Sequence, residues 1–154
     1  LNIMERGATV LLNARLLPVI DEFLQAVRRA LDARGIRAER MIVRSDGSLM
    51  SEAHARTAPV QTILSGPAAS VVGSRVLAGS ENCLIVDMGG TTTDVSIVRG
   101  GQPRRTDGIR IGGYRTQIGG VYIDTFGPGG DSRVVVRDGE LNLTAPRVQP
   151  LCWQ

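Results

Sequence analysis

The strongest constraint on the fold is a stretch of eight residues, Asp87 to Asp94, that reads DMGGTTTD. An apolar run, Leu84–Val86, comes before it, and a second apolar run, Val95–Val98, follows it. Short apolar runs bounded by glycine indicate buried strands. The sequence therefore predicts a strand, an exposed loop and a second strand, with Asp87 directly after the last residue of the first strand.

The loop between these strands has the composition of an anion site. Gly89 and Gly90 carry no β-carbon, so the backbone can approach a ligand closely and direct consecutive N–H groups at it. Thr91, Thr92 and Thr93 add hydroxyl donors without much bulk. This combination predicts a phosphate-binding loop with several backbone N–H groups that lack protein acceptors.

The aspartates at the two ends of the loop need a different explanation, since a carboxylate repels phosphate. Asp87 and Asp94 can hold Mg²⁺, usually through water, and the metal then bridges to phosphate oxygens. The structural alternative is a tight hairpin with a polar turn. A turn alone does not require aspartates at both ends of an eight-residue connection, so the pattern favours the phosphate loop.

The second half of the chain is predicted to be a β-meander. Gly100-Gly101 and Asp138-Gly139 are hairpin-turn signals, because such residues tolerate positive φ. Glycine-rich breaks separate the remaining strands. Besides the first strand, which leads into Asp87, the expected strands are 94–99, 109–111, 121–126, 133–137 and 140–143.

The first half is predicted to be rich in helix. Apolar residues at a spacing of three and four predict a helix from Pro18 to Arg34, with Gly35 just past its end. A short strand, 40–44, should follow it and run into the polar turn 45–48. A second helix is expected to be capped by Ser65 and to extend to about Leu77, which gives an α/β chain with a boundary near residue 79.

Composition excludes several classes of function. The net charge is +3, but the arginines are spread along the chain and aromatic residues make up 3%, which argues against nucleic-acid binding. No apolar run approaches the length of a membrane span. The sequence contains no lysine and a single histidine, His54, which excludes a Walker lysine and a multi-histidine metal cluster. Cys83 and Cys152 are expected to be reduced thiols of a cytoplasmic protein.

Several motifs in order resemble the hydantoinase/oxoprolinase family, whose relatives include actin-like ATPases and sugar kinases. They are Ser65-Gly66-Pro67-Ala68, the loop 87–94, and Gly127-Pro128-Gly129-Gly130-Asp131-Ser132. Shorter matches at Glu5-Arg6, Asn13-Ala14 and Ser45-Asp46-Gly47 extend the likeness over nearly the whole chain. Pro128 and Asp131 depart from the usual form of the later glycine loop, and this departure weakens any assignment of substrate.

The resemblance implies a two-lobed, ribonuclease H-like ATPase fold. Residues 1–79 would be the end of the first lobe plus a connecting helix, and 80–154 the start of the second lobe. ATP and Mg²⁺ would serve to open a cyclic amide of hydantoin or 5-oxoproline type by phosphorylating the amide oxygen. Asp87 and Asp94 would be catalytic, and Mg²⁺ would lie near Asp87, through water, and near Asp131. The residues implied to bind nucleotide are Ser65, Gly66, Gly89, Gly90, Thr91, Thr92, Thr93, Gly127, Gly129 and Gly130.

The implied partners are the cyclic amide, the rest of a longer parent chain and a possible second enzyme subunit, with no nucleic acid and no membrane. The isolated chain is expected to be inactive. Two alternatives stay open. The loop could serve a non-catalytic nucleotide-binding or regulatory module, or the chain could belong to an acetone carboxylase-type subunit.

Overall fold

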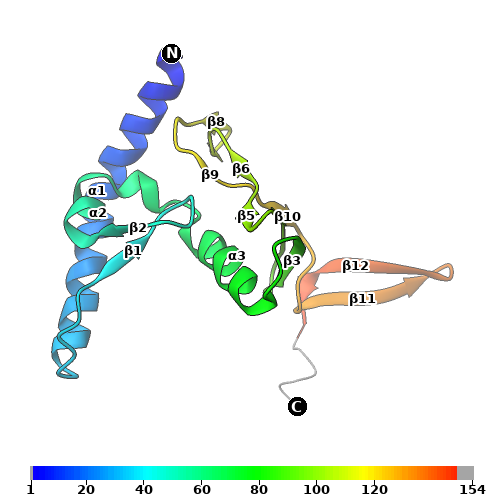
Figure 1. Ribbon diagram of the computed structural model, residues 1–154. Helices are drawn as coiled ribbons and strands as arrows, with labels where there is room; N and C mark the ends of the chain where they lie inside the picture. The colour runs from blue at the N-terminus through cyan, green and yellow to red at the C-terminus, as the bar shows by residue number, and fades with distance from the viewer. Residues whose placement is uncertain (1, 149–154) are drawn as a thin grey trace. The chain divides into compact units, whose positions relative to one another are not determined.

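The computed structural model describes residues 2–148, which form two compact units (Figure 1). Unit 1 comprises the chain up to Val72 together with Arg105–Val121, and unit 2 comprises Gly73–Arg104 together with the chain from Tyr122 onward. The chain is mixed α/β, as predicted, with its helices in the first half and most of its strands in the second. Within the part described, no helix has the length and apolar character needed to cross a membrane.

Unit 1 begins with a long helix, α1 (Ile3–Asp32), which starts well before the predicted position. Asn2 caps it, since the Asn2 side chain accepts a hydrogen bond from the Met4 N–H at 3.0 Å. Pro18 lies inside the helix, so the prediction that it opens the helix was wrong. A proline is tolerated in the first turn of a helix, whereas in the interior it costs about 3 kcal/mol. Packing along the rest of the helix offsets that cost here. Gly35 has φ +69° just past the end, as predicted.

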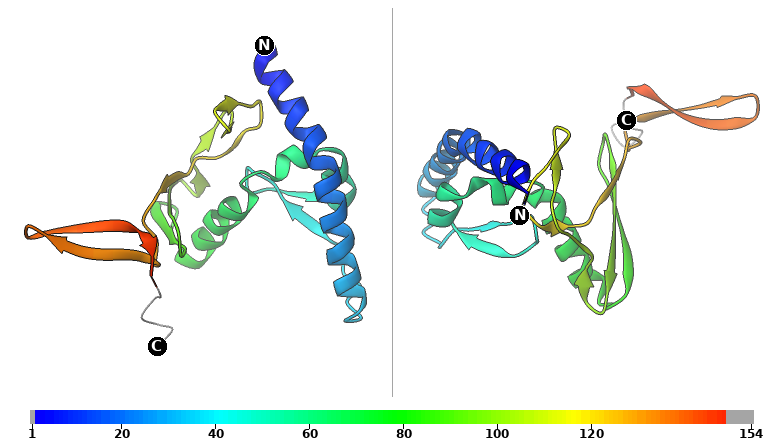
Figure 2. Two further views of the ribbon diagram at one scale, coloured as in Figure 1. Left: turned by 180° about the vertical axis from the view of Figure 1, so that it is seen from behind. Right: turned by 90° about the horizontal axis from the view of Figure 1, so that it is seen from above.

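A hairpin and two short helices pack against α1. Strand β1 (Met41–Val43) pairs antiparallel with β2 (Leu49–Ser51), and the chain continues through α2 (Glu52–Thr57) and the 3-10 helix η1 (Pro59–Thr62). Figures 1 and 2 show the hairpin and α2 side by side with α1 from three directions. The core consists of Leu24, Met50 and Ala55, each less than 7% exposed.

A later segment of the chain, Arg105–Val121, completes unit 1. Strand β6 (Arg105–Thr106) pairs with β9 (Gly120–Val121), and between them β7 (Arg110–Ile111) pairs with β8 (Tyr114–Arg115). The Gln117 N–H donates to Thr9 Oγ1 at 2.9 Å, and this hydrogen bond connects the segment to α1. Residues 121–126 were predicted as one strand but form two, β9 and β10, with a break at 122–123.

Helix α3 (Ser65–Ala78) confirms the second predicted helix, with one correction. Ser65 is the first helical residue and not the cap, because Leu64, with φ +58°, occupies the preceding position. The Leu64 carbonyl accepts the Ala68 N–H at 3.1 Å and closes the first turn. Pro67 has no N–H to offer a capping side chain, so the turn is closed through Ala68 instead.

Unit 2 contains an antiparallel sheet in the order β10-β4-β3, with β5 also paired to β4. Residues 85, 96 and 98 are buried on one face, whereas residues 84, 86 and 88 are exposed on the other. The Gly100-Gly101 turn has φ +55° and +70°, as a hairpin turn requires. The strands are β3 (Cys83–Met88), β4 (Thr93–Arg99), β5 (Gln102–Pro103) and β10 (Asp124–Phe126).

A separate hairpin of β11 (Ser132–Arg137) and β12 (Glu140–Arg147) follows β10. Its turn is Asp138-Gly139, with φ +53° and +81°, which confirms the predicted signal. Strand β12 extends beyond the predicted residue 143 because it keeps its pairing with β11, apart from an irregularity next to Ser132.

Candidate functional site

The predicted phosphate loop is the connection between β3 and β4, and it is shorter than the sequence suggested. Met88 pairs with Thr93 and Asp87 with Asp94, so the connection comprises residues 89–92. Asp87 is therefore the penultimate residue of β3, and the prediction that it follows the strand was wrong. The pairing of β3 with β4 continues past the two aspartates because β-branched Thr93 favours extended backbone. It stops where Gly89 follows Met88.

The backbone N–H groups of this connection are partly engaged. Gly89 donates to the Thr92 carbonyl at 2.9 Å and closes the turn. Among the described residues, the N–H groups of Gly90 and Thr92 have no acceptor. Gly90 is exposed and Thr92 half-buried, so solvent reaches both residues near the tip of the turn. A loop with such donors can bind an anion.

A second glycine-rich segment, residues 127–131, packs directly on this turn. The Gly130 N–H donates to the Gly89 carbonyl at 2.8 Å, and the Asp131 N–H donates to the Gly90 carbonyl at 2.9 Å. A β-carbon at Gly129 would lie 2.6 Å from the Gly90 carbonyl oxygen, so only glycine fits there. Residues 89–92 and 127–131 are called the glycine-loop pair below. The sequence predicted both members but gave no sign of their contact.

Two side chains fix the geometry of the glycine-loop pair. The Thr93 hydroxyl is buried and donates to the Pro128 carbonyl at 2.7 Å, so its one proton is already used. The Asp131 carboxylate covers Gly90, where an added β-carbon would lie 2.8 Å from Asp131 Oδ2. Asp131 therefore brings a negative charge onto the predicted phosphate loop.

Asp87 and Asp94 face each other across the β3–β4 ladder. Residues directly opposite in a sheet project from the same face, and like charges there are unfavourable. Thr125, which pairs with Asp94 on its other side, donates its hydroxyl to Asp94 Oδ1 at 2.7 Å. The sequence did not single out Thr125, because its position opposite Asp94 depends on pairing between distant strands.

The donor set suits Mg²⁺ only in part. Carboxylate oxygens are ligands that Mg²⁺ prefers. Within residues 2–148, however, no group of three or more His, Cys, Asp or Glu side chains could hold a metal ion. Mg²⁺ often keeps several waters and takes one or two carboxylates plus substrate phosphates. Asp87 and Asp94 fit that type of site and not an all-protein cage.

Ser65 and Gly66 open α3 and belong to unit 1, whereas the glycine-loop pair belongs to unit 2. Helix α3 continues from unit 1 into unit 2, since the division falls between Val72 and Gly73. A part for Ser65 and Gly66 in binding nucleotide therefore stays a prediction.

Comparisons with known proteins define the class. The structure resembles a chain described as "Mechanism of ATP-Dependent Acetone Carboxylation, Acetone Carboxylase nucleotide-free structure", with a TM-score of 0.64 and 22% identity over 80% of this chain and 18% of that one. At that identity the likeness is one of fold. The family model described as Hydantoinase/oxoprolinase matches residues 6–150. The chain belongs to the hydantoinase/oxoprolinase family.

Two curated relatives are similar over almost the whole chain. Caprolactamase subunit alpha of Pseudomonas jessenii is 28% identical over 96% of this chain and 22% of its own length. The 5-oxoprolinase 1 of Arabidopsis thaliana is 34% identical over 97% of this chain and 12% of its own length. The chain therefore spans less than a quarter of either relative.

Proposed function

We propose that the chain is part of an ATP-dependent enzyme that opens cyclic amides, and that the glycine-loop pair binds the phosphates of the nucleotide. The observation that carries this proposal is the pair of N–H groups without an acceptor among the described residues, Gly90 and Thr92, beside two facing carboxylates. Both named relatives act, by their names, on lactams, and the structural neighbour is described as ATP-dependent. These descriptions support ATP as co-substrate and a cyclic amide as substrate.

Each part of the glycine-loop pair has its own role in this proposal. Gly90 and Thr92 donate N–H groups to phosphate oxygens, the Thr92 hydroxyl adds a donor, and Thr91 lies between them in the turn. Thr93 positions the second segment, since its hydroxyl is bound to the Pro128 carbonyl. Gly129 and Gly130 bring their backbone against the turn, and Gly127 allows the chain to bend toward it.

The carboxylates have the role of holding the metal. With no lysine in the chain, positive charge near the phosphates has to come from elsewhere. Bound Mg²⁺ supplies that charge by neutralising phosphate oxygens. Asp87, which is exposed, orients it through water, and Asp94 is kept in place by Thr125. Asp131, whose carboxylate lies at Gly90, is proposed to contact the hydrated metal through water and not as a direct ligand.

In the proposed reaction the γ-phosphoryl group of ATP is transferred to the amide oxygen of the ring, and ADP leaves. The carbon becomes electrophilic and takes up water. The C–N bond then breaks with the proton going to the ring nitrogen, and a second water hydrolyses the remaining acyl phosphate to a carboxylate and inorganic phosphate. The two-lobed ribonuclease H-like fold, the assignment of residues 1–79 and 80–154 to its lobes, and a cytoplasmic location belong to the same proposal.

The test is Asp87→Asn in a full-length protein that carries this chain. Asparagine keeps the size and one acceptor oxygen but loses the charge that orients a hydrated Mg²⁺. We expect ATP hydrolysis to fall roughly 10- to 100-fold, as for loss of a group that acts through a metal's outer sphere. The thermal midpoint should change little or rise, because removing Asp87 relieves its repulsion with Asp94. Steady-state hydrolysis with and without Mg²⁺ is compared with the thermal midpoint.

Asp138→Asn is the matched control, because it removes the same charge from a turn that tolerates asparagine. It should leave hydrolysis unchanged. Thr92→Ala should lower hydrolysis less than Asp87→Asn, since it removes a hydroxyl and keeps the backbone donor. If Asp87→Asn keeps the hydrolysis rate and the magnesium dependence of the wild type, Asp87 is a structural residue. The same conclusion follows if the variant loses activity only because it unfolds.

The 154-residue chain by itself should show no ATP-dependent opening of hydantoin or 5-oxoproline. Positioning of both reactants can contribute on the order of 7 to 11 kcal/mol to the lowering of a barrier, and a chain that spans less than a quarter of its relatives lacks most of the surface that would do so. Product formation is followed by chromatography. Turnover that Asp87→Ala abolishes would contradict this expectation.

A further inference from the structure

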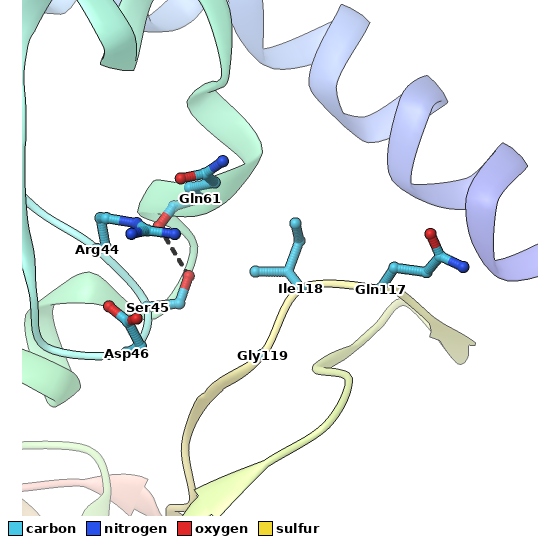
Figure 3. A pocket seen from close by; sticks show the side chains of 7 residues that line it. All are labelled: Arg44, Ser45, Asp46, Gln61, Gln117, Ile118 and Gly119. Atoms are coloured by element: carbon cyan, nitrogen blue, oxygen red, sulfur yellow. Dashed lines mark hydrogen bonds between the residues drawn. The ribbon is translucent and has the colours of Figure 1, made fainter.

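Unit 1 and unit 2 each contain a cavity that is lined in part by arginine. The cavity of unit 1, about 210 Å³, lies between the β1–β2 turn and η1 (Figure 3). Figure 3 shows the Ser45 hydroxyl bonded to the Gln61 carbonyl at its wall. Two side-chain atoms there, Arg44 Nε and Gln61 Oε1, have no partner among the described residues, but both are shielded from solvent. A ligand in this cavity therefore cannot reach them.

The cavity of unit 2, called the arginine cavity below, has a volume of about 390 Å³ and lies on the hairpin of β4 and β5. Its lining residues are Ile97, Arg99, Gln102 and Arg104. Arg99 pairs with Gln102, and the Arg104 N–H donates to the Ile97 carbonyl at 2.9 Å. Residues opposite each other, and residues two apart along a strand, project from the same face of a sheet. The four side chains therefore share one face of the hairpin.

The length of β4 separates the arginine cavity from the glycine-loop pair. Thr93, next to the β3–β4 turn, begins β4, and Arg99 ends it. From residue 93 to residue 99 an extended strand rises about 20 Å. The arginine cavity and the predicted phosphate loop are therefore separate places in unit 2.

Arg99 and Arg104 bring two positive charges to the arginine cavity. Neither forms an ion pair with a carboxylate among the described residues. Like charges on neighbouring positions of one sheet face are unfavourable, so the two guanidinium groups together favour an anion between them. Both side chains are exposed, and a ligand can reach them from solvent.

The Arg104 side chain is also held in position. Its guanidinium carbon lies 4.3 Å from the centroid of the Tyr122 ring. Tyr122 in turn donates its hydroxyl to Asp124 Oδ1 at 2.8 Å and its N–H to the Arg104 carbonyl at 2.7 Å. A guanidinium stacked on an aromatic ring keeps its N–H donors available in its own plane. Because Arg104 is already ordered, less side-chain entropy is lost when a ligand binds.

These side chains specify the chemistry of a ligand. A guanidinium presents a planar fork of N–H donors that matches a carboxylate or a phosphate. Two guanidinium groups match two negative charges, and Ile97 offers an apolar wall for a short carbon chain. The volume lies near the lower end of the 300 to 1,000 Å³ typical of ligand sites, so the ligand is small.

We propose that the arginine cavity binds a small organic dianion, either a dicarboxylate or a phosphate monoester. Arg99 and Arg104 donate to its oxygens, and Ile97 contacts its carbon atoms. Neither ATP nor Mg²⁺ takes part in this binding, so the site is additional to the proposed function.

The test is direct binding of succinate to a full-length protein that carries this chain, without ATP or Mg²⁺, by ligand-observed NMR titration. Butyrate is the matched probe, because it has the same number of carbon atoms and one carboxylate fewer. Phenyl phosphate is the probe for a phosphate monoester. We expect succinate or phenyl phosphate to bind at least about tenfold more tightly than butyrate, and the tighter of the two identifies the kind of dianion.

Substitutions locate the binding. Arg99→Gln and Arg104→Gln should each weaken binding of the preferred dianion about tenfold. Arg99→Lys, which keeps the charge and loses the planar fork, should weaken it less. Arg137→Gln is the matched control, because it removes an exposed arginine of unit 2 that does not line the cavity, and it should have no effect. Asp87→Asn should bind the dianion as the wild type does.

Three results would overturn the proposal. Butyrate binding as tight as that of both dianions would show that the two arginines do not act together. An equal loss in Arg137→Gln and Arg99→Gln would show general attraction to a basic surface. The third result is that neither dianion binds to the wild type. A lower thermal midpoint of Arg99→Gln would then show that a carboxylate elsewhere in the full-length protein neutralises the arginines.

Discussion

Two hairpins of unit 2 use glycine for different reasons. The β11–β12 turn, Asp138-Gly139, has φ +53° and +81°, and a β-carbon at Gly139 would meet no atom within 4 Å. The β3–β4 turn contains Gly89 and Gly90, neither of which has positive φ. Its carbonyls instead accept hydrogen bonds from the second glycine segment. Glycine in the first turn satisfies a dihedral requirement, whereas Gly90 in the second makes room for the close approach of the Asp131 carboxylate.

This difference supports the proposal that the β3–β4 turn binds a ligand. A hairpin turn that only reverses the chain needs residues that tolerate positive φ and nothing more. The β3–β4 turn is backed by residues 127–131 and lies next to two aspartates that face each other. These features add nothing to the reversal of the chain, and they agree with the proposed binding of phosphate and a hydrated metal there.

The sharpest test of the comparison is Gly129→Ala. The new β-carbon would lie 2.6 Å from both the Gly90 carbonyl oxygen and the Thr91 carbonyl carbon, and backbone cannot move aside as a side chain can. We expect a loss of about 3 kcal/mol in the free energy of unfolding, at the upper end for overpacking. Gly139→Ala, which has strain but no clash, should cost about 1 kcal/mol. Denaturant unfolding of the two variants measures both, and equal losses would contradict the distinction.

A smaller effect is expected for Gly90→Ala. Its β-carbon would lie 2.8 Å from Asp131 Oδ2, which is the end of a side chain and can rotate away. The expected loss is about 1 kcal/mol, well below that of Gly129→Ala. The double variant Gly90→Ala with Asp131→Ala should recover most of it, as measured by a double-mutant cycle. If the losses in unfolding free energy of the two single variants simply add in the double variant, the Asp131 side chain is not the group for which Gly90 makes room.

The smallest expected effect concerns a third turn, between β1 and β2, where Asp46 is held by its own neighbours. Partial burial raises the pKa of Asp46, but hydrogen bonds from the side chain and backbone of Ser48, with the nearby charges of Arg44 and Arg105, outweigh it and lower the pKa below its ordinary value. Because the pKa of Asp46 is lower in the folded state than the unfolded value of about 3.9, the ionised carboxylate stabilises the folded state above that pH. This stabilisation is lost as the pH falls through the pKa of the folded state.

Asp46→Asn should therefore reduce the loss of stability on acidification below about pH 4 and leave a flatter profile than the wild type. Unfolding free energies at a series of pH values measure this, with Asp107→Asn, an exposed aspartate of the same unit, as the control. A profile for Asp46→Asn that matches the wild type would show that the Ser48 hydrogen bonds do not persist in solution.

The sequence alone predicted the elements whose causes are local. Strands β3, β4, β7 and β11, helix α3, and the turns at Gly100-Gly101 and Asp138-Gly139 follow from apolar runs and from residues that tolerate positive φ. The order of three motifs was also enough to identify the family, which the match over residues 6–150 confirms.

Tertiary structure decided the features that depend on distant contacts. The sequence could not show that Pro18 lies within α1, because packing, and not the first turn, determines where that helix begins. Nor could it show that Asp87 pairs with Asp94, that Thr125 bonds to Asp94, or that Gly129 lies against Gly90. Residue types and spacing determine local conformation, whereas a site is made by the backbone of separate segments coming within hydrogen-bond distance.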